Sequence, residues 1–167
     1  MNYESAKLVA TLAHKNQKYG NHPYSYHLQM VVDILKHYNL GPRYIASGWL
    51  HDILEYTEVT FAELSESFGE EVASIVEACT GRGSNRIDRN ADIRLKLEVF
   101  CPDAKKVKLA DRMANIHNCI IEGNVGLRQM YIREDIQFSQ TVAIGVPIEM
   151  WDDYRNLVST LQPLSYL

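Results

Sequence analysis

The sequence predicts an all-α protein, a single helical bundle of 167 residues. Apolar residues recur every three or four positions along most of the chain, which is the spacing that places them on one face of a helix. Short tracts rich in Gly, Asn, Pro or Ser separate these periodic segments. No segment alternates apolar and polar residues as a half-buried strand does. A chain of this length is ample for one hydrophobic core and short for two, so we expect residues 1–167 to form one domain.

The first half of the chain predicts three helices. The first should run to about Lys18, where the tract Tyr-Gly-Asn-His-Pro at residues 19–23 interrupts the pattern. The second ends at the Asn-Leu-Gly tract of residues 39–41. Pro42 stands where helices commonly begin, and a third helix is predicted to run from there to Leu54.

The rest of the chain predicts further helices separated by clear stop signals. Thr60 and Glu63 have the spacing of a capping box, in which each side chain satisfies a free backbone N–H at the start of a helix. The Gly- and Asn-rich tract 81–85 is predicted to be a flexible loop. Later helices are expected at residues 72–80, around 94–97, at 102–123 and, at the C-terminal end, within about 125–162.

The composition restricts the possible partners. A formal net charge of -4 and a pI near 5.8 provide no general basic surface, so nucleic-acid binding is disfavoured, whereas a small anionic substrate remains possible. No window approaches ~18 uninterrupted apolar residues and no secretory signal opens the chain, so we expect neither a membrane span nor secretion. Cys79, Cys101 and Cys119 are far apart and form no CxxC pair, which favours a reducing, cytoplasmic setting.

Ionisable residues gather at three places in the predicted helices. His51 and Asp52 are adjacent, and Glu55 follows within one helical turn. His27 lies at the start of the second helix. A polar face with spacings of three and four follows in the helix predicted for 102–123, formed by Lys108, Asp111 and Asn115. Each group taken alone is more simply explained as a solvated surface or a helix cap than as a functional site.

Taken together, these residues have the order H…HD…D, and this order resembles that of the HD superfamily of metal-dependent phosphohydrolases. Two imidazoles (His27 and His51) and two carboxylates (Asp52 and Asp111) suit Mn²⁺, Fe²⁺ or Zn²⁺ better than a sulfur-loving metal. A divalent ion lowers the pKa of water toward about 7, as phosphoester hydrolysis requires. No histidine lies between Asp52 and Asp111, so we expect one ion per chain rather than two.

Three longer segments resemble the hydrolase domain of RelA/SpoT proteins and the small alarmone hydrolases. They are residues 13–17 with 23–27 (AHKNQ and PYSYH), residues 50–57 (LHDILEYT) and residues 107–115 (VKLADRMAN). The resemblance covers roughly residues 5–120. It implies an all-α HD-domain fold, one ion that is usually Mn²⁺, and hydrolysis of the 3′-pyrophosphate of (p)ppGpp with release of pyrophosphate.

The resemblance also implies roles for individual residues. The implied metal ligands are His27, His51, Asp52 and Asp111. Glu55 would hold or deprotonate the attacking water. The candidate substrate contacts are Lys18, Tyr24, Lys108 and Asn115, with Asn115 on the nucleotide and Lys108 either steadying the site or neutralising phosphate.

Two departures from the family pattern bear on catalysis and on base recognition. Where the family carries an Asp beside the catalytic Glu, this chain has Tyr56, a phenol that is neutral and able to donate a hydrogen bond. Tyr56 is therefore a second candidate catalytic residue, which either turns into the core or faces the substrate. Where the family has a basic residue associated with guanine recognition, this chain has Tyr19, with Lys18 beside it.

The leading hypothesis is a metal-dependent pyrophosphohydrolase acting on an alarmone such as (p)ppGpp or (p)ppApp. A second hypothesis is a mononuclear HD 5′-nucleotidase that releases phosphate from deoxynucleoside monophosphates. A third is a nucleotide-binding module with weak or no catalysis because of Tyr56. The sequence leaves open the base, the number of phosphates, the native metal and the oligomeric state.

Overall fold

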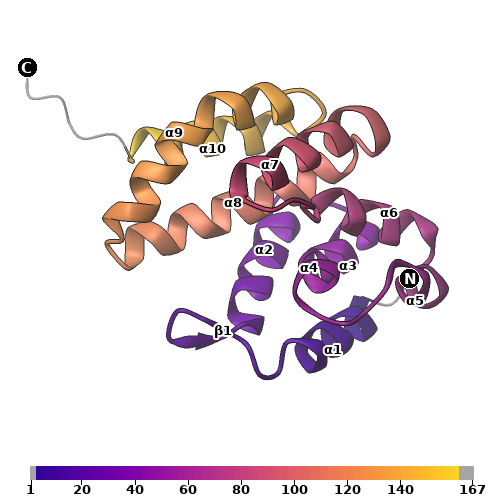
Figure 1. Cartoon of the computed structure of the whole chain (residues 1–167). Coiled ribbons are helices and arrows are strands. Elements are labelled where there is room, and N and C mark those ends of the chain that lie inside the picture. Colours follow the sequence, from indigo (N-terminus) through magenta and orange to yellow (C-terminus); the bar gives the residue numbers. More distant parts are fainter. Residues whose placement is uncertain (1–2, 162–167) are drawn as a thin grey trace, which may run out of the picture.

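The computed structural model describes residues 3–161 and is built almost entirely of helices, as predicted (Figure 1). The first helices are α1 (Tyr3–Ala13), α2 (Ser25–His37), α3 (Pro42–Leu50), α4 (Ile53–Tyr56), α5 (Phe61–Phe68) and α6 (Glu70–Cys79). They are followed by α7 (Arg86–Leu95), α8 (Ala104–Ile121), α9 (Val125–Val142) and α10 (Ile148–Ser159). A π-helical segment, Lys96–Phe100, extends α7. None of the helices between residues 3 and 161 has both the length and the apolar character needed to cross a membrane.

Helix α8 lies in the middle of the molecule. It packs against α2, α3 and α6 on one side and against α9 and α10 on the other (Figure 1). Its buried face carries Val107, Ala110 and Ala114, whose small or branched side chains allow close packing of the neighbouring helices. One long helix therefore contacts both groups of helices, α2, α3 and α6 on one side and α9 and α10 on the other.

Gly48 explains how α2 and α3 approach each other. A Cβ atom at this position would lie 2.5 Å from Cδ1 of Leu35 and 3.2 Å from Cγ2 of Val32, both on α2. Glycine lowers the stability of a helix interior, and here the cost is offset because only hydrogen fits between the two helices. The close packing places the end of α3, and with it His51, directly beside α2.

The first helix is shorter than predicted. It ends at Ala13 because the next residue, His14, turns inward, is 2% exposed and bonds through Nδ1 to Oε1 of Gln17. The chain then forms a hairpin of two short strands, β1 (Lys18–Tyr19) and β2 (His22–Pro23), with Gly20 at a φ of 57° in the turn. The prediction of no strands was wrong here, because two-residue strands are too short to show an alternating pattern.

The helix predicted from Pro42 to Leu54 is divided into α3 and α4. His51 and Asp52 lie in the turn between them, and Asp52 has φ -103° and ψ -2°, which is the sparsely populated region between helix and strand. The long helix predicted from residue 102 begins at Ala104, and the two C-terminal helices are present as α9 and α10, although residue 162 lies outside the described range.

The capping box at the start of α5 is confirmed, and it yields a stability prediction. The Thr60 hydroxyl accepts from the Glu63 backbone N–H at 3.3 Å, and the Glu63 carboxylate accepts from the Thr60 backbone N–H at 2.8 Å. Thr60→Ala should lower the free energy of unfolding by about 1 kcal/mol, because a helix N–H loses its acceptor. Urea unfolding measures the change, with Ser67→Ala on the exposed side of α5 as control. Equal stability of the two variants would contradict the prediction.

Candidate active site

Four side chains from three parts of the chain converge beside α8. His27 comes from the first turn of α2, His51 and Asp52 from the turn after α3, and Asp111 from the middle of α8. The Nε2 atom of His27 lies 3.3 Å from Nε2 of His51, 3.2 Å from Oδ1 of Asp111 and 3.6 Å from Oδ2 of Asp52. The Nε2 atom of His51 lies 3.1 Å from Oδ2 of Asp52 and 3.6 Å from Oδ1 of Asp111. We call His27, His51, Asp52 and Asp111 the ligand cluster.

The donor atoms of the ligand cluster have the spacing that a divalent ion requires. One atom each from His27, His51 and Asp111 lie within 4.8 Å of one another, and all three residues are buried. Neighbouring ligands of an octahedral ion with bonds of about 2.1 Å are about 3.0 Å apart, close to the separations found here. Nδ1 of His51 lies 2.9 Å from the Gly48 carbonyl oxygen, an acceptor for its proton, so that Nε2 of the neutral ring would offer its lone pair to an ion in the cluster. The residues therefore fit a metal ion.

The electrostatics of the ligand cluster also favour a cation. Burial alone would lower the pKa of His51, but the carboxylates of Asp52 and Asp111 outweigh it and raise this pKa to about 10. Burial alone would raise the pKa of Asp111, but Lys108 and the two imidazoles hold it well below its usual range. Both carboxylates are therefore ionised at neutral pH, and the space between them and the imidazoles attracts positive charge.

Polar neighbours hold both carboxylates in place. The Tyr24 hydroxyl donates to Oδ2 of Asp52 at 2.6 Å, and the Tyr24 ring stacks on His14. The Lys108 ammonium donates to Oδ2 of Asp111 at 2.9 Å. These contacts leave Oδ1 of Asp111 facing His27, and they fix the orientation of the ligands as bonded neighbours do in known metal sites.

Asn115 and Tyr19 form a second contact to the cluster. The Asn115 amide donates to Oδ1 of Asp111 at 2.5 Å, and its oxygen accepts a hydrogen bond of 2.8 Å from the Tyr19 hydroxyl. The Tyr19 ring stacks on His27 with ring centroids 4.7 Å apart. The hairpin β1–β2, which the sequence did not predict, therefore delivers Tyr19 to the site.

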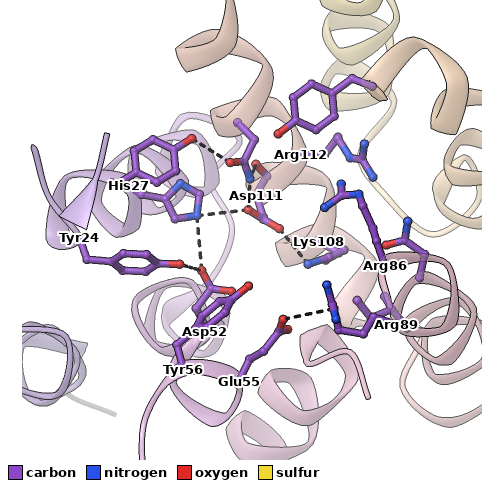
Figure 2. A pocket seen from close by; sticks show the side chains of 15 residues that line it. Tyr24, His27, Asp52, Glu55, Tyr56, Arg86, Arg89, Lys108, Asp111 and Arg112 are labelled. Carbon is purple, nitrogen blue, oxygen red and sulfur yellow. Dashed lines mark hydrogen bonds and ion pairs between the residues drawn. The ribbon is translucent and has the colours of Figure 1, made fainter. Parts of the chain in front are cut away.

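A cavity of about 260 Å³ opens from the ligand cluster toward α7 (Figure 2). His27, Asp52 and Asp111 line one side of it. The opposite side is basic, and its cationic residues, which we call the basic face, are Arg86, Arg89, Lys108 and Arg112. The molecule has a net charge of -4, so this grouping of four cations is a local feature. An ion site facing several cations across a small cavity suits a polyanionic ligand.

Glu55 lies between the two sides of the cavity. Its Oε2 accepts a hydrogen bond of 3.2 Å from the Gly81 backbone N–H, and its Oε1 lies 4.0 Å from Nε of Arg89. Gly81 packs tightly against α7, where a Cβ atom would lie 2.8 Å from Cβ of Arg89. Glu55 is thus held from two directions while lining the cavity, which leaves a carboxylate oxygen able to accept a proton there.

Of two other residues singled out in the sequence, Tyr56 lines the cavity and Lys18 does not. Tyr56 is 50% exposed and lines the cavity beside Glu55, so of the two positions considered for it, the core is excluded. Burial, together with Asp52 and Glu55, raises the pKa of Tyr56, so the phenol is neutral at physiological pH. Lys18 is exposed on β1 and is not among the residues that line the cavity.

The sequence analysis missed the contribution of α7 and α9. Arg86, Arg89 and Asn90 line the cavity from α7, and Tyr131 lines it from α9. The α7 residues have helical spacings of three and four, so a shared face was visible in the sequence. Nothing in that spacing indicated that the face would be turned toward the ligand cluster.

The chain matches an HD-domain family model and is similar to proteins named as pyrophosphohydrolases. The family model described as "HD domain" matches residues 5–99. The chain is 34% identical over 142 residues to guanosine-3′,5′-bis(diphosphate) 3′-pyrophosphohydrolase MESH1 of Danio rerio, an alignment that covers 80% of this chain and 77% of the relative. It is 37% identical over 100 residues to guanosine-3′,5′-bis(diphosphate) 3′-pyrophosphohydrolase of Spiroplasma citri, covering 56% of this chain but only 13% of that protein.

A solved structure shares the fold of this chain. The solved structure of a metazoan ortholog of SpoT matches with a TM-score of 0.81 and 18% sequence identity, and the match covers 95% of this chain and 94% of the other. The segment matched by the family model contains His27, His51 and Asp52. The chain belongs to the HD-domain family and, within it, to the family of the MESH1 proteins.

Proposed function

We propose that this protein is a metal-dependent pyrophosphohydrolase that removes pyrophosphate from the 3′ position of a guanosine or adenosine alarmone, such as (p)ppGpp or (p)ppApp. The observation that carries the proposal is the cavity in which the ligand cluster faces Arg86, Arg89, Lys108 and Arg112. A nucleotide bearing a pyrophosphate presents several negative charges to such a basic face. The names of the relatives from Danio rerio and Spiroplasma citri support the same substrate class.

We assign one divalent ion to the ligand cluster, with Mn²⁺ as the leading candidate and Fe²⁺ or Zn²⁺ as alternatives. Two imidazoles and two carboxylates form a mixed donor set of borderline hardness. Such an ion, when bound, polarises a phosphoryl oxygen and lowers the pKa of water. The Lys108 ammonium donates to Oδ2 of Asp111 at 2.9 Å. This contact supports one ion rather than two, because Oδ2 is already bonded to a cation.

We assign the proton transfer to Glu55. It lines the cavity near Asp52 and is held in place by the Gly81 N–H, so its remaining oxygen can take a proton from the attacking water. The water oxygen forms a bond to phosphorus while the bond from phosphorus to the nucleotide 3′ oxygen breaks, and the electron pair of that bond passes to the 3′ oxygen. This oxygen takes up the proton that Glu55 accepted, so a nucleotide with a 3′ hydroxyl and pyrophosphate are released. Arg89 and Lys108 then neutralise charge on the phosphates, as cations that line the cavity do in phosphoryl-transfer sites.

We assign base and sugar contacts to the side of the cavity formed by Tyr19, Tyr24 and Asn115. Tyr19 and Asn115 are bonded to each other at 2.8 Å, so a nucleotide that binds to Asn115 must share or replace this contact. Tyr19 carries no charge for recognising the guanine carbonyl, and this supports acceptance of adenine as well as guanine. Lys18 lies outside the cavity lining, which weakens its candidacy as a substrate contact.

The experiment that tests the proposal is a nucleotide panel incubated with the Mn²⁺-loaded protein. The panel contains ppGpp, pppGpp, ppApp and deoxynucleoside monophosphates, and the products are separated by ion-exchange chromatography. Pyrophosphate released from a 3′-pyrophosphorylated nucleotide is the expected result. Orthophosphate released from a deoxynucleoside monophosphate would replace the proposal with a 5′-nucleotidase, and tight binding without any product would replace it with a binding module.

Tyr56 provides a sharper test of the family comparison. Tyr56→Asp should raise the rate of pyrophosphate release from ppGpp several-fold, because an ionised acceptor replaces a neutral phenol beside Glu55. The variant should fold, since half of the Tyr56 side chain is already exposed. Single-turnover rates under saturating Mn²⁺ measure the effect, with Tyr56→Phe as the control for loss of the hydroxyl alone. An unchanged or lower rate in the folded, metal-loaded Asp variant would mean that Tyr56 does not limit hydrolysis.

We also propose that the chain acts as one domain in a reducing compartment such as the cytoplasm. The three cysteines are free, and Cys79 and Cys119 are buried, which suits a setting without disulfide formation. Helix α8 carries Asp111 and also packs against both halves of the bundle, which supports a single domain. No nucleic-acid partner is proposed, since the basic face lines a cavity rather than an open surface.

A further inference from the structure

Glu134, on α9, joins the three helices that form the basic side of the cavity. Its carboxylate accepts two hydrogen bonds from Arg86 of α7, from Nε at 2.6 Å and from Nη2 at 3.1 Å. It also accepts from Nη1 of Arg112 on α8 at 2.9 Å and from the Asn90 amide on α7 at 3.2 Å. We call Glu134, Arg86, Asn90 and Arg112 the Glu134 cluster.

The three donors of the Glu134 cluster all line the cavity, whereas Glu134 itself does not. Glu134 lies behind them, with a side chain that is 19% exposed. Burial alone would raise its pKa, but Arg86 and Arg112 outweigh this and lower the pKa, so the carboxylate is ionised at neutral pH. One partly buried negative charge therefore bonds to two cations and one amide at the edge of the substrate cavity.

Arg112 is further restrained by aromatic rings. Its guanidinium carbon lies 5.0 Å from the centre of the Tyr131 ring and 4.4 Å from that of Phe138, both on α9. No aromatic ring within residues 3–161 restrains Arg86 in this way, and 47% of its side chain is exposed. Arg86 thus depends on the carboxylate of Glu134 for its position, while Arg112 has independent support.

We propose that Glu134 is a positioning residue for substrate binding, which holds Arg86 so that its guanidinium faces the phosphates of the ligand. The proposal rests on the proposed function in taking the ligand to be a pyrophosphate-bearing nucleotide. It gives α9 a role in the site, although this helix lies beyond the segment matched by the HD-domain model. Glu134 then affects the affinity for an anion in two opposite ways.

As a charge, Glu134 opposes anion binding, because a carboxylate near phosphates repels them. As an anchor, it favours binding, because it fixes a flexible arginine in the conformation that the ligand needs. Glu134→Gln separates the two effects by sign. Affinity for an anion should rise if charge alone matters and fall if positioning matters.

The test is calorimetric binding of inorganic pyrophosphate to the Mn²⁺-loaded protein. We expect Glu134→Gln to raise the Kd about 10-fold, the size of effect that loss of one well-placed charge-assisted contact produces. Arg86→Gln should raise it by a similar factor. The double variant should be no weaker than either single variant, because both changes remove the same contact. Tighter or unchanged binding by Glu134→Gln would overturn the proposal, as would failure of the parent protein to bind pyrophosphate, and so would additive effects in the double variant.

A matched control separates positioning from general loosening of the fold. Arg94 of α7 donates to the side chain of Gln137 of α9, a second link between the same two helices, and neither residue lines the substrate cavity. Gln137→Ala should leave the Kd for pyrophosphate within about twofold of the parent, since it removes a link between these helices without releasing Arg86. An equal loss of affinity in this control would assign the effect to helix docking and overturn the proposal.

Kinetics with ppGpp distinguish failure of this inference from failure of the proposed function. If ppGpp is the substrate, Glu134→Gln should raise KM about 10-fold and change kcat less than about threefold, because uniform binding is lost. Pyrophosphate binding tests the Glu134 cluster even if ppGpp is not hydrolysed. If Glu134→Gln does not fold, Arg86→Gln carries the test, since this side chain is half-exposed and its loss leaves Arg112 bonded to Glu134.

Discussion

His51→Ala is expected to remove the bound metal and to abolish hydrolysis. The His51 side chain is fully buried, and its Nε2 faces Asp52 at 3.1 Å and His27 at 3.3 Å. Loss of a residue that merely supports a ligand costs about 10- to 100-fold in metal affinity, so loss of a ligand itself should cost at least about 100-fold. The parent protein should hold close to one Mn²⁺ per chain after gel filtration, and the variant close to none. Inductively coupled plasma mass spectrometry measures both.

Two further variants distinguish loss of a metal ligand from misfolding of the His51→Ala protein. Asp111→Asn keeps the shape of the side chain while removing its charge, so it should fold and still lose most of its affinity for Mn²⁺. His117→Ala removes an exposed histidine of the same helix, α8, and should keep the metal content of the parent. Two ions per chain in the parent would contradict the assignment, and so would metal retained by the double variant His51→Ala and Asp111→Ala.

The helices and the convergence of the ligand cluster were predictable from sequence for a definite reason. Apolar periodicity fixes which face of each helix is buried, and the order H…HD…D belongs to a family whose members share one packing of these helices. The structure brings His27, His51 and Asp111 together as the resemblance implied, with all three buried. Their role as ligands stays a prediction until metal binding is measured, as does the prediction of one domain over residues 1–167.

Local details near the site were not predictable in the same way. The sequence favours helix through residues 42–54, yet the chain turns at His51 and Asp52, because the packing of α3 against α2 and the contacts of the two side chains outweigh local helix propensity. Tyr19 reached the site through a hairpin with two-residue strands, a length that no periodicity can reveal. Backbone that leaves regular structure near a site is where local rules are expected to fail.

The basic face was missed for a different reason. Arg86 and Arg89 share one face of α7, but most residues around them in the sequence are polar. A polar helical face is most often solvated. Only the tertiary structure shows that Glu55 and Glu134, from two distant segments, contact these arginines at the edge of the cavity. Long-range charge pairing of this kind leaves no trace in the spacing of a single sequence.

Glu55→Gln is expected to reduce the rate of hydrolysis by about 100- to 10,000-fold, the range that a general base contributes. Glutamine keeps the length of the side chain, and its amide oxygen can still accept from the Gly81 N–H, which the Glu55 carboxylate now does at 3.2 Å. The change therefore removes the basic oxygen without releasing the loop before α7. Because the lost group acts on the chemical step, metal content should stay at the parent level and the Kd for ppGpp should change by less than about fivefold.

Single-turnover measurement with ppGpp separates these quantities, since it reports the chemical step independently of product release. Glu58→Gln, at an exposed residue three positions after Glu55, serves as the control for removing one negative charge from this stretch of chain and should retain the parent rate. A Glu55→Gln rate within about twofold of the parent would remove Glu55 from the mechanism. The proton would then have to pass to another group that lines the cavity, and Tyr56 is a poor substitute, because its phenol stays protonated at neutral pH and can accept a proton only weakly. A large loss of rate with metal and nucleotide binding intact would instead identify Glu55 as the general base. It would then act without the second carboxylate that the family carries at the position of Tyr56.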